Sequence, residues 1–202
     1  MKQLFSLFCF LVSLSSLHAN TPDRAARSYV EQPKKYRVDT YDFSGVYPNL
    51  ENIDINARKK KHVKFDLSGE YPVLETVEYE GSFGLFDGKL TGFYPNLKFA
   101  TFSMTNSLMD FDLRGKWQRS CEINISGTDR DVTLYLPSDI GISVEAHTGL
   151  KGSVHAPAEF KKRGWLPFAK KVYENELVET ADVVLHITVS TGDGHVYLKP
   201  SE

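Results

Sequence analysis

Residues 43–50 read Phe-Ser-Gly-Val-Tyr-Pro-Asn-Leu, and this short stretch returns twice further along the chain. Residues 67–74 read Leu-Ser-Gly-Glu-Tyr-Pro-Val-Leu, and residues 90–97 read Leu-Thr-Gly-Phe-Tyr-Pro-Asn-Leu. A fourth, incomplete copy at 113–117 keeps the glycine and an aromatic residue but lacks the proline. The glycines recur about every 23 residues, and a fixed period of this size is typical of proteins built from stacked repeats.

The residues on both sides of each copy alternate between apolar and polar. Around the second copy, the apolar residues Val63, Phe65 and Leu67 come before the proline, and Val77 and Tyr79 come after it. Steps of two place such side chains on one face of a β-strand. Glycine permits unusual backbone angles, and proline fixes φ and lacks a backbone donor, so the motif predicts a bend between two strands.

A single repeat of this kind cannot bury its apolar face, whereas stacked repeats share a continuous core. We therefore predict an all-β domain made of stacked β-coils or closely layered β-hairpins, a β-solenoid-like repeat fold. Leucine-rich repeats are an alternative, because residues 50–55 match their LxxLxL pattern and the period fits. Two features disfavour them: Arg58 stands where their asparagine is expected, and the other half of each repeat alternates at a period of two.

The pattern changes near Gly127. Cys121, Ile123 and Ile125 precede this glycine at the spacing seen before the earlier repeat glycines, which predicts an equivalent strand. Cys121 is interpreted as a buried small apolar side chain, with a reactive or intermolecular thiol as the alternative. Residues 157–181 are polar and basic, and they predict an irregular excursion from the β-repeat domain.

The first residues have the features of a secretory signal peptide. Residues 1–19 contain Lys2, a short apolar stretch diluted by serines, and Ala19 at a plausible cleavage site. We divide the chain into this signal peptide, a polar extension at 20–37 and a single β-repeat domain at 38–199. We expect the mature chain to be exported to the periplasm, the cell surface or the outside. The alternative is an uncleaved leader that tethers an envelope-stress signalling domain.

Charge and cysteine content exclude several classes. The 202 residues contain 24 Lys and Arg against 26 Asp and Glu, a formal net charge of −2. This balance argues against a nucleic-acid-binding protein. Two cysteines cannot form a disulfide scaffold or a four-cysteine zinc site.

The C-terminal half resembles a known pattern. Residues 132–144 (VTLYLPSDIGISV), a glycine turn, a variable excursion and residues 185–196 (LHITVSTGDGHV) resemble the putative-adhesin and cell-wall-stress-response "toastrack" β-repeat domains. The resemblance covers about 120–199 and, more loosely, the earlier repeats. It implies a right-handed, solenoid-like stack of β-hairpins in an envelope or exported protein, generally without catalysis. It supplies no site residues.

One candidate binding feature is a set of four aromatic residues. Each stands two residues after a repeat glycine: Tyr47, Tyr71, Tyr94 and Trp117. Neighbouring strands lie about 4.8 Å apart, so the rings should line up at one corner of the stack. They form either a structural ladder packed against the motif prolines or an exposed platform that binds the sugar rings of an envelope glycan.

A second candidate is the basic run Arg58, Lys59, Lys60 and Lys61. A charge run in a turn is usually solvated, and it protects neighbouring strands from pairing with other chains. The alternative is contact with an anionic surface, such as lipid headgroups or envelope polymers.

We predict no metal site, because the histidines lack metal-binding spacing. We also predict no cofactor and no catalytic residue. The role we expect is non-enzymatic: envelope structure, adhesion, or binding of a ligand or protein partner, with self-association through open ends. A carbohydrate-active enzyme on a β-solenoid is the alternative. It would need two carboxylates at a defined separation, whereas Asp129, Asp131 and Asp193 stand in predicted turns, where aspartate is common.

Overall fold

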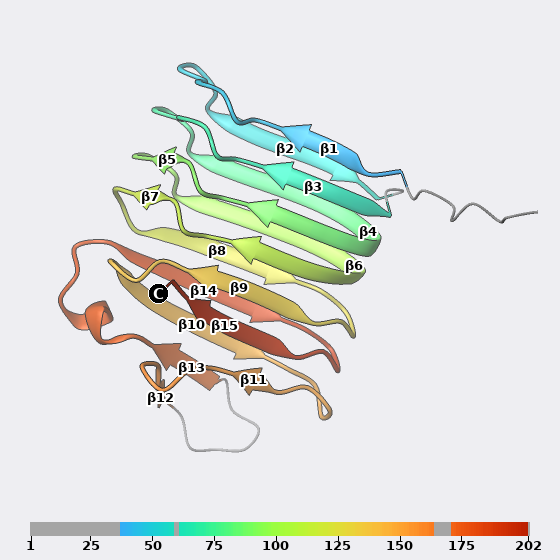
Figure 1. The fold of residues 1–202 in the computed structure, drawn as a ribbon, viewed down its shortest axis with the longest axis vertical. Helices are drawn as coiled ribbons and strands as arrows, with labels where there is room; N and C mark the ends of the chain where they lie inside the picture. Colours follow the sequence, from blue (N-terminus) through green and yellow to red (C-terminus); the bar gives the residue numbers. More distant parts are fainter. Residues whose placement is uncertain (1–36, 59–60, 164–170, 202) are drawn as a thin grey trace, which may run out of the picture. The chain divides into compact units, whose positions relative to one another are not determined.

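The computed structural model describes residues 37–58, 61–163 and 171–201 (Figure 1). The predicted signal peptide and almost all of the polar extension therefore lie outside the described residues. The strands are β1 (Asp39–Asp42), β2 (Asn52–Ala57), β3 (His62–Asp66), β4 (Thr76–Lys89), β5 (Phe93–Tyr94), β6 (Phe99–Asp112), β7 (Lys116–Trp117), β8 (Cys121–Ser126), β9 (Val132–Leu136), β10 (Gly141–His147), β11 (Val154–His155), β12 (Lys161–Arg163), β13 (Lys171–Glu174), β14 (Val184–Ser190) and β15 (Val196–Pro200). A short 3₁₀ turn, η1, spans Glu176–Glu179.

The strands form two rows, because each coil of the chain contributes one stretch to each row. Row A contains β1, β3, the second half of β4, the second half of β6, β9, β15 and β11. Row B contains β2, the first half of β4, the first half of β6, β8, β14, β10, β13 and β12. The 14-residue strands β4 and β6 bend from row B into row A, so both rows belong to one sheet.

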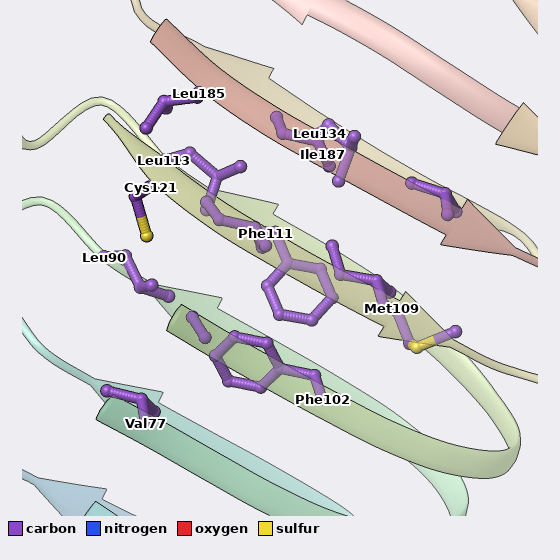
Figure 2. Close-up of a cluster of buried hydrophobic side chains, with 14 of the residues drawn as sticks. Val77, Leu90, Phe102, Met109, Phe111, Leu113, Cys121, Leu134, Leu185 and Ile187 are labelled. Atoms are coloured by element: carbon purple, nitrogen blue, oxygen red, sulfur yellow. The ribbon is translucent and has the colours of Figure 1, made fainter. Parts of the chain in front are cut away.

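The core lies between the rows. Phe102 of row B and Phe111 of row A have ring centroids 4.9 Å apart, and both are fully buried. Figure 2 shows the same convergence of side chains from β6, β8 and β14. The alternation before the second repeat glycine is confirmed, since Val63, Phe65 and Leu67 are all buried. The all-β fold class is thus confirmed.

The coils pair in parallel with the coils before and after them, with registers such as Val63 beside Phe86. From β1 to β11, each strand segment of one row is followed in sequence by a segment of the opposite row, so the repeats are coils rather than the hairpins that the family resemblance implied. Antiparallel pairing occurs in the described residues at β13, with β10 on one side and β12 on the other.

One strand assignment from the sequence is wrong. β8 pairs with the first half of β6, with Ile123 beside Ala100, and therefore belongs to row B. The spacing to Gly127 predicts that β8 is equivalent to residues 63–67, which lie in row A or directly follow a row A strand. Alternation has the same period in both rows, so counting back from a glycine does not distinguish them. The corner at 116–117 does distinguish the two rows, because a strand of row B follows each corner of this kind along the chain.

The last coil in sequence is not the last coil in the stack (Figure 1). β14 lies between β8 and β10, and β15 lies between β9 and β11, in parallel with all four. Along the sequence, the outer coil (β10 and β11) therefore comes before the coil that lies beside β8 and β9 (β14 and β15). In the segment 157–181, which the sequence predicts to be irregular, the structure has β12, β13 and η1.

Asn175 joins the return segment to the stack. Its side-chain amide donates to the carbonyl oxygen of Ile140 over 2.8 Å, and its side-chain oxygen accepts from the Ile142 amide over 2.9 Å. These two bonds fasten the segment between β13 and η1 to the start of β10.

Candidate functional site

The two corners between the rows carry the two sets of residues that the sequence singles out. The repeat motifs form what we call the motif corner, where row A turns into row B. The turns after β2, within β4 and β6, and after β8 form the opposite, basic corner, named after Arg58 and Lys61.

The motif corner holds a ladder of stacked rings. The rings of Tyr47 and Tyr71 are 5.7 Å apart with 5° between their planes, and those of Tyr71 and Tyr94 are 5.6 Å apart with 3°. Trp117 continues the ladder, 4.8 Å from Tyr94. Tyr71 and Tyr94 are fully buried, Trp117 is 6 % exposed and Tyr47 is half-buried.

This burial contradicts the exposed sugar platform. A platform must offer ring faces to the ligand, whereas each inner ring has a neighbouring ring on both sides. The polar ends are also occupied: the Tyr94 hydroxyl donates to the Leu67 carbonyl and accepts from the Gly92 amide, and Trp117 Nε1 donates to the Leu113 carbonyl over 2.9 Å. Desolvation raises the pKa of Tyr94 well above its ordinary value. The geometry is that of a structural ladder.

The basic corner is built from turns that need unusual backbone angles. Gly84 has φ of +131°, and a Cβ there would meet the Lys61 carbonyl of the preceding coil. Asn106 has φ of +55°, and its amide donates to Thr128 Oγ1 over 2.9 Å. Asparagine tolerates this left-handed conformation better than most residues. The turns are thereby held against one another from coil to coil.

A groove of about 530 Å³ runs along the row A side of this corner. We call it the corner groove, and it is lined by Lys61, His62, Gly84, Leu85, Asn106, Leu108 and Arg130. Leu85 and Leu108 are neighbours in register and are 47 % and 40 % exposed. Lys61 and Arg130 are both exposed and come from the turns on either side of the two leucines. The groove therefore combines an apolar floor with cationic groups.

Arg58 lies on the other side of the same corner. It lines a second hollow of about 350 Å³ together with Ser82, Ser103 and Ser126. Its guanidinium pairs with the Glu80 carboxylate, so its charge is partly neutralised. Of the predicted basic run, the structure thus places Arg58 and Lys61 at one corner. Lys59 and Lys60 lie outside the described residues.

Sequence reasoning missed the two leucines and Arg130. A signal was present for the leucines: Leu85 and Leu108 stand directly before Phe86 and Met109, whose side chains face the core. Alternation therefore directs Leu85 and Leu108 outward, and an apolar residue repeated at an outward position is unusual on a solvated face.

The aspartates proposed for the enzyme alternative have structural roles in the turns. Asp129 Oδ1 accepts from the Asp193 amide over 3.2 Å, and Asp131 Oδ1 accepts from the His195 amide over 2.8 Å. Asp193 also lies 3.7 Å from the Lys151 ammonium. Across residues 37–58, 61–163 and 171–201, no group of three or more His, Cys, Asp or Glu side chains is placed to hold a metal ion.

Cys121 is 1 % exposed in the core, and desolvation raises the pKa of its thiol to about 12. Because the thiolate is the nucleophile, this environment suits a small apolar side chain rather than a reactive one. In the described part of the chain, no helix has the length and apolar character needed to cross a membrane.

The sequence matches no family model and no curated protein. Among solved structures, the crystal structure of a putative cell adhesion protein from Clostridium sporogenes is similar, with a TM-score of 0.56 and 22 % sequence identity. The match covers 70 % of this chain and 58 % of that chain. The likeness is one of fold. It does not confirm the family resemblance drawn from the C-terminal half of the sequence, and the neighbour's own name describes that protein alone.

Proposed function

We propose that this chain is an exported, non-enzymatic β-repeat protein of the cell envelope that acts in adhesion, by contacting an anionic lipid surface through the corner groove. The single observation that carries the proposal is the pair of exposed leucines between Lys61 and Arg130 in that groove. The similar fold of a protein named for cell adhesion supports the general role.

An anionic lipid surface fits both parts of the groove. Each basic side chain close to such a surface contributes about 1 kcal/mol, and apolar side chains gain when they leave water for the boundary of the acyl chains. Asp87 and Asp110 follow Leu85 and Leu108 by two positions in row A. Their carboxylates repel anionic headgroups at that place. Contact is therefore expected to centre on the turns, with weak and salt-sensitive affinity.

Vesicle binding tests this function. The chain from residue 20 onward would be mixed with vesicles of phosphatidylcholine, with and without phosphatidylglycerol, and the bound fraction measured by flotation. We expect binding that needs phosphatidylglycerol and falls between low salt and roughly 0.5 M salt. Lys61→Gln with Arg130→Gln should weaken it about tenfold or more.

The matched control is Lys116→Gln with Arg119→Gln, which removes one exposed lysine and one exposed arginine at the motif corner instead. The control should bind as the unaltered protein does. Equal losses in both variants would show a general charge effect, and binding that ignores salt would contradict the proposal outright.

A further inference from the structure

Two histidines from different coils converge on one hydroxyl group at the β11 end of row A. His155 is the last residue of β11, and His195 directly precedes β15. Ser153 Oγ lies 2.8 Å from His155 Nε2 and also 2.8 Å from His195 Nδ1. The two imidazole nitrogens are therefore at most twice that distance apart.

The parallel pairing of β11 with β15 brings these side chains together. His155 pairs with Tyr197, and the Val196 amide donates to the Ser153 carbonyl oxygen over 2.9 Å. Val196 is fully buried. Because side chains alternate between the two faces of a strand, Ser153, His155 and His195 lie on the outward face of row A. His155 is exposed there, and a small ion in solution can reach its ring.

Contacts on both sides hold the two histidines in place. The His155 ring stacks on the Tyr197 ring, with 4.8 Å between the centroids and 9° between the planes. The His195 amide donates to Asp131 Oδ1 over 2.8 Å, which also places a carboxylate beside this histidine. A ligand pair that is already ordered loses less conformational freedom on binding, and a nearby negative charge favours a cation.

The shared hydroxyl cannot use the lone pairs of both rings. A serine hydroxyl carries one hydrogen, so Ser153 donates to at most one of the two nitrogens, and the other nitrogen must donate its own hydrogen to Oγ. Each neutral imidazole has one nitrogen with a free lone pair. A cation between the rings would accept both lone pairs at once, which the single hydroxyl hydrogen cannot do.

The distances suit an ion of zinc size. Zn²⁺ binds imidazole nitrogen at about 2.0–2.1 Å in a tetrahedral arrangement, which places its ligand atoms roughly 3.3 Å from one another. The two nitrogens lie 2.8 Å from Ser153 Oγ, so each needs to move away from it by only about half an ångström to surround an ion. Imidazole ligands favour Zn²⁺, Cu²⁺ and Ni²⁺, whereas Mg²⁺ and Ca²⁺ prefer oxygen ligands.

We propose that His155 Nε2 and His195 Nδ1 together bind Zn²⁺, with Ser153 Oγ beside the ion and water at the remaining positions. The ion joins β11 to β15, and thereby the outer coil to the coil next to it. Only the folded chain brings the two histidines together, so binding adds to the stability of the fold.

This pair is smaller than most protein metal sites. The part of the chain that the structure describes has no metal-binding group of three or more His, Cys, Asp or Glu side chains, and we therefore expect moderate affinity. Spacing along the sequence gives no signal of the pair, because the stacking of β11 on β15 creates it.

Calorimetric titration with Zn²⁺ tests the site, using the chain from residue 20 onward without an affinity tag. We expect one ion per chain, with a dissociation constant of about 100 µM or lower. His155→Gln and His195→Gln should each weaken binding about tenfold or more, because only one imidazole ligand remains. Saturating Zn²⁺ should also slow hydrogen exchange of the Val196 amide in the unaltered chain and leave it unchanged in His195→Gln.

The matched control is His186→Gln, which removes an exposed histidine from β14 in row B. It should bind Zn²⁺ as the unaltered protein does. No binding up to about 1 mM Zn²⁺ would overturn the proposal, and so would unchanged affinity in both His155→Gln and His195→Gln. An equal loss in the control would also overturn it, since the ion would then not depend on this pair.

Discussion

The ring of Tyr71 lies parallel to the ring of Tyr94, with 5.6 Å between their centroids and 3° between their planes. Each hydroxyl reaches back to a carbonyl oxygen of the preceding coil, Phe43 for Tyr71 and Leu67 for Tyr94. The repeat motif therefore stacks coils in two ways at once, through ring packing and through a bond from coil to coil.

Alkaline pH should destabilise the protein, in large part through this ladder. Desolvation raises the pKa of Tyr71 and Tyr94 in the ladder and of Tyr79 in the core. In the unfolded chain these tyrosines ionise near pH 10, so the folded state binds more protons above that pH and loses stability as pH rises. The expected slope is about 1.4 kcal/mol per pH unit for each tyrosine.

Denaturant unfolding checks this slope when it is measured at a series of pH values that crosses the ordinary tyrosine pKa of about 10, starting near pH 8. Tyr94→Phe should flatten it while lowering stability at neutral pH by about 1 kcal/mol or more, because the Gly92 amide and Leu67 carbonyl lose a partner. A slope that the substitution leaves unchanged would show that the ladder does not govern alkaline unfolding.

Glycine at the motif corner should be required in the inner coils and dispensable in the first. A Cβ at Gly92 would meet the carbonyl oxygens of Gly69 and Leu67 in the preceding coil. A Cβ at Gly45 would meet only the Tyr47 ring, at 3.4 Å or more. We expect Gly92→Ala to cost about 1–3 kcal/mol through overpacking and Gly45→Ala to change stability by less than about 0.5 kcal/mol.

Thermal and denaturant unfolding of the two alanine variants measure this difference directly. Similar losses at both positions would contradict this account, because a Cβ at Gly45 meets no backbone atom of a preceding coil.

Removal of the last coil in sequence (β14 and β15) should destabilise the outer coil (β10 and β11). β14 separates β10 from β8, so a chain ending at residue 183 leaves β10 without its neighbour on the side of the stack. We expect the amides of Gly141–His147 to lose protection while those of β4 and β6 keep theirs. Ile187→Ala, in a position 1 % exposed, should cost about 2–5 kcal/mol.

Hydrogen exchange resolved by strand is the measurement for both variants. Continued protection of β10 in the shortened chain would mean that β10 docks directly on β8, against the strand order seen here.

The Cys121 thiol should be inert while the protein is folded. Burial raises its pKa to about 12, so the thiolate is scarce at pH 8 and solvent has little access to the sulfur. We expect a thiol reagent to modify Cys121 at pH 8 at a rate that follows unfolding and increases greatly in denaturant. Rapid labelling under native conditions would revive the alternative of a reactive thiol.

The sequence predicts the coils better than their order. Alternation around Phe65 and Leu67 predicts the core correctly, because a period of two decides which side chains face inward. The insertion of β14 between β8 and β10 could not be predicted, since apolar alternation is alike in every strand and carries no information about which neighbour a strand selects.

The candidate site is likewise only partly predictable from the sequence. Arg58 and Lys61 could be recognised as a basic turn, but the distant Arg130 joins Lys61 only because three coils bring their turns side by side. The aromatic ladder could be predicted as a column from its spacing. Burial is one of the two alternatives that the sequence leaves open, and the structure shows it for Tyr71, Tyr94 and Trp117.

The role of Leu85 and Leu108 in surface contact decides the central claim. The direct measurement is the fraction of protein bound to phosphatidylglycerol-containing vesicles for Leu85→Ser with Leu108→Ser, beside a Val46→Ser control that alters an exposed apolar residue elsewhere. The account predicts a loss of several-fold or more in the leucine variant and none in the control. Binding by the folded leucine variant that equals that of the unaltered protein would contradict it.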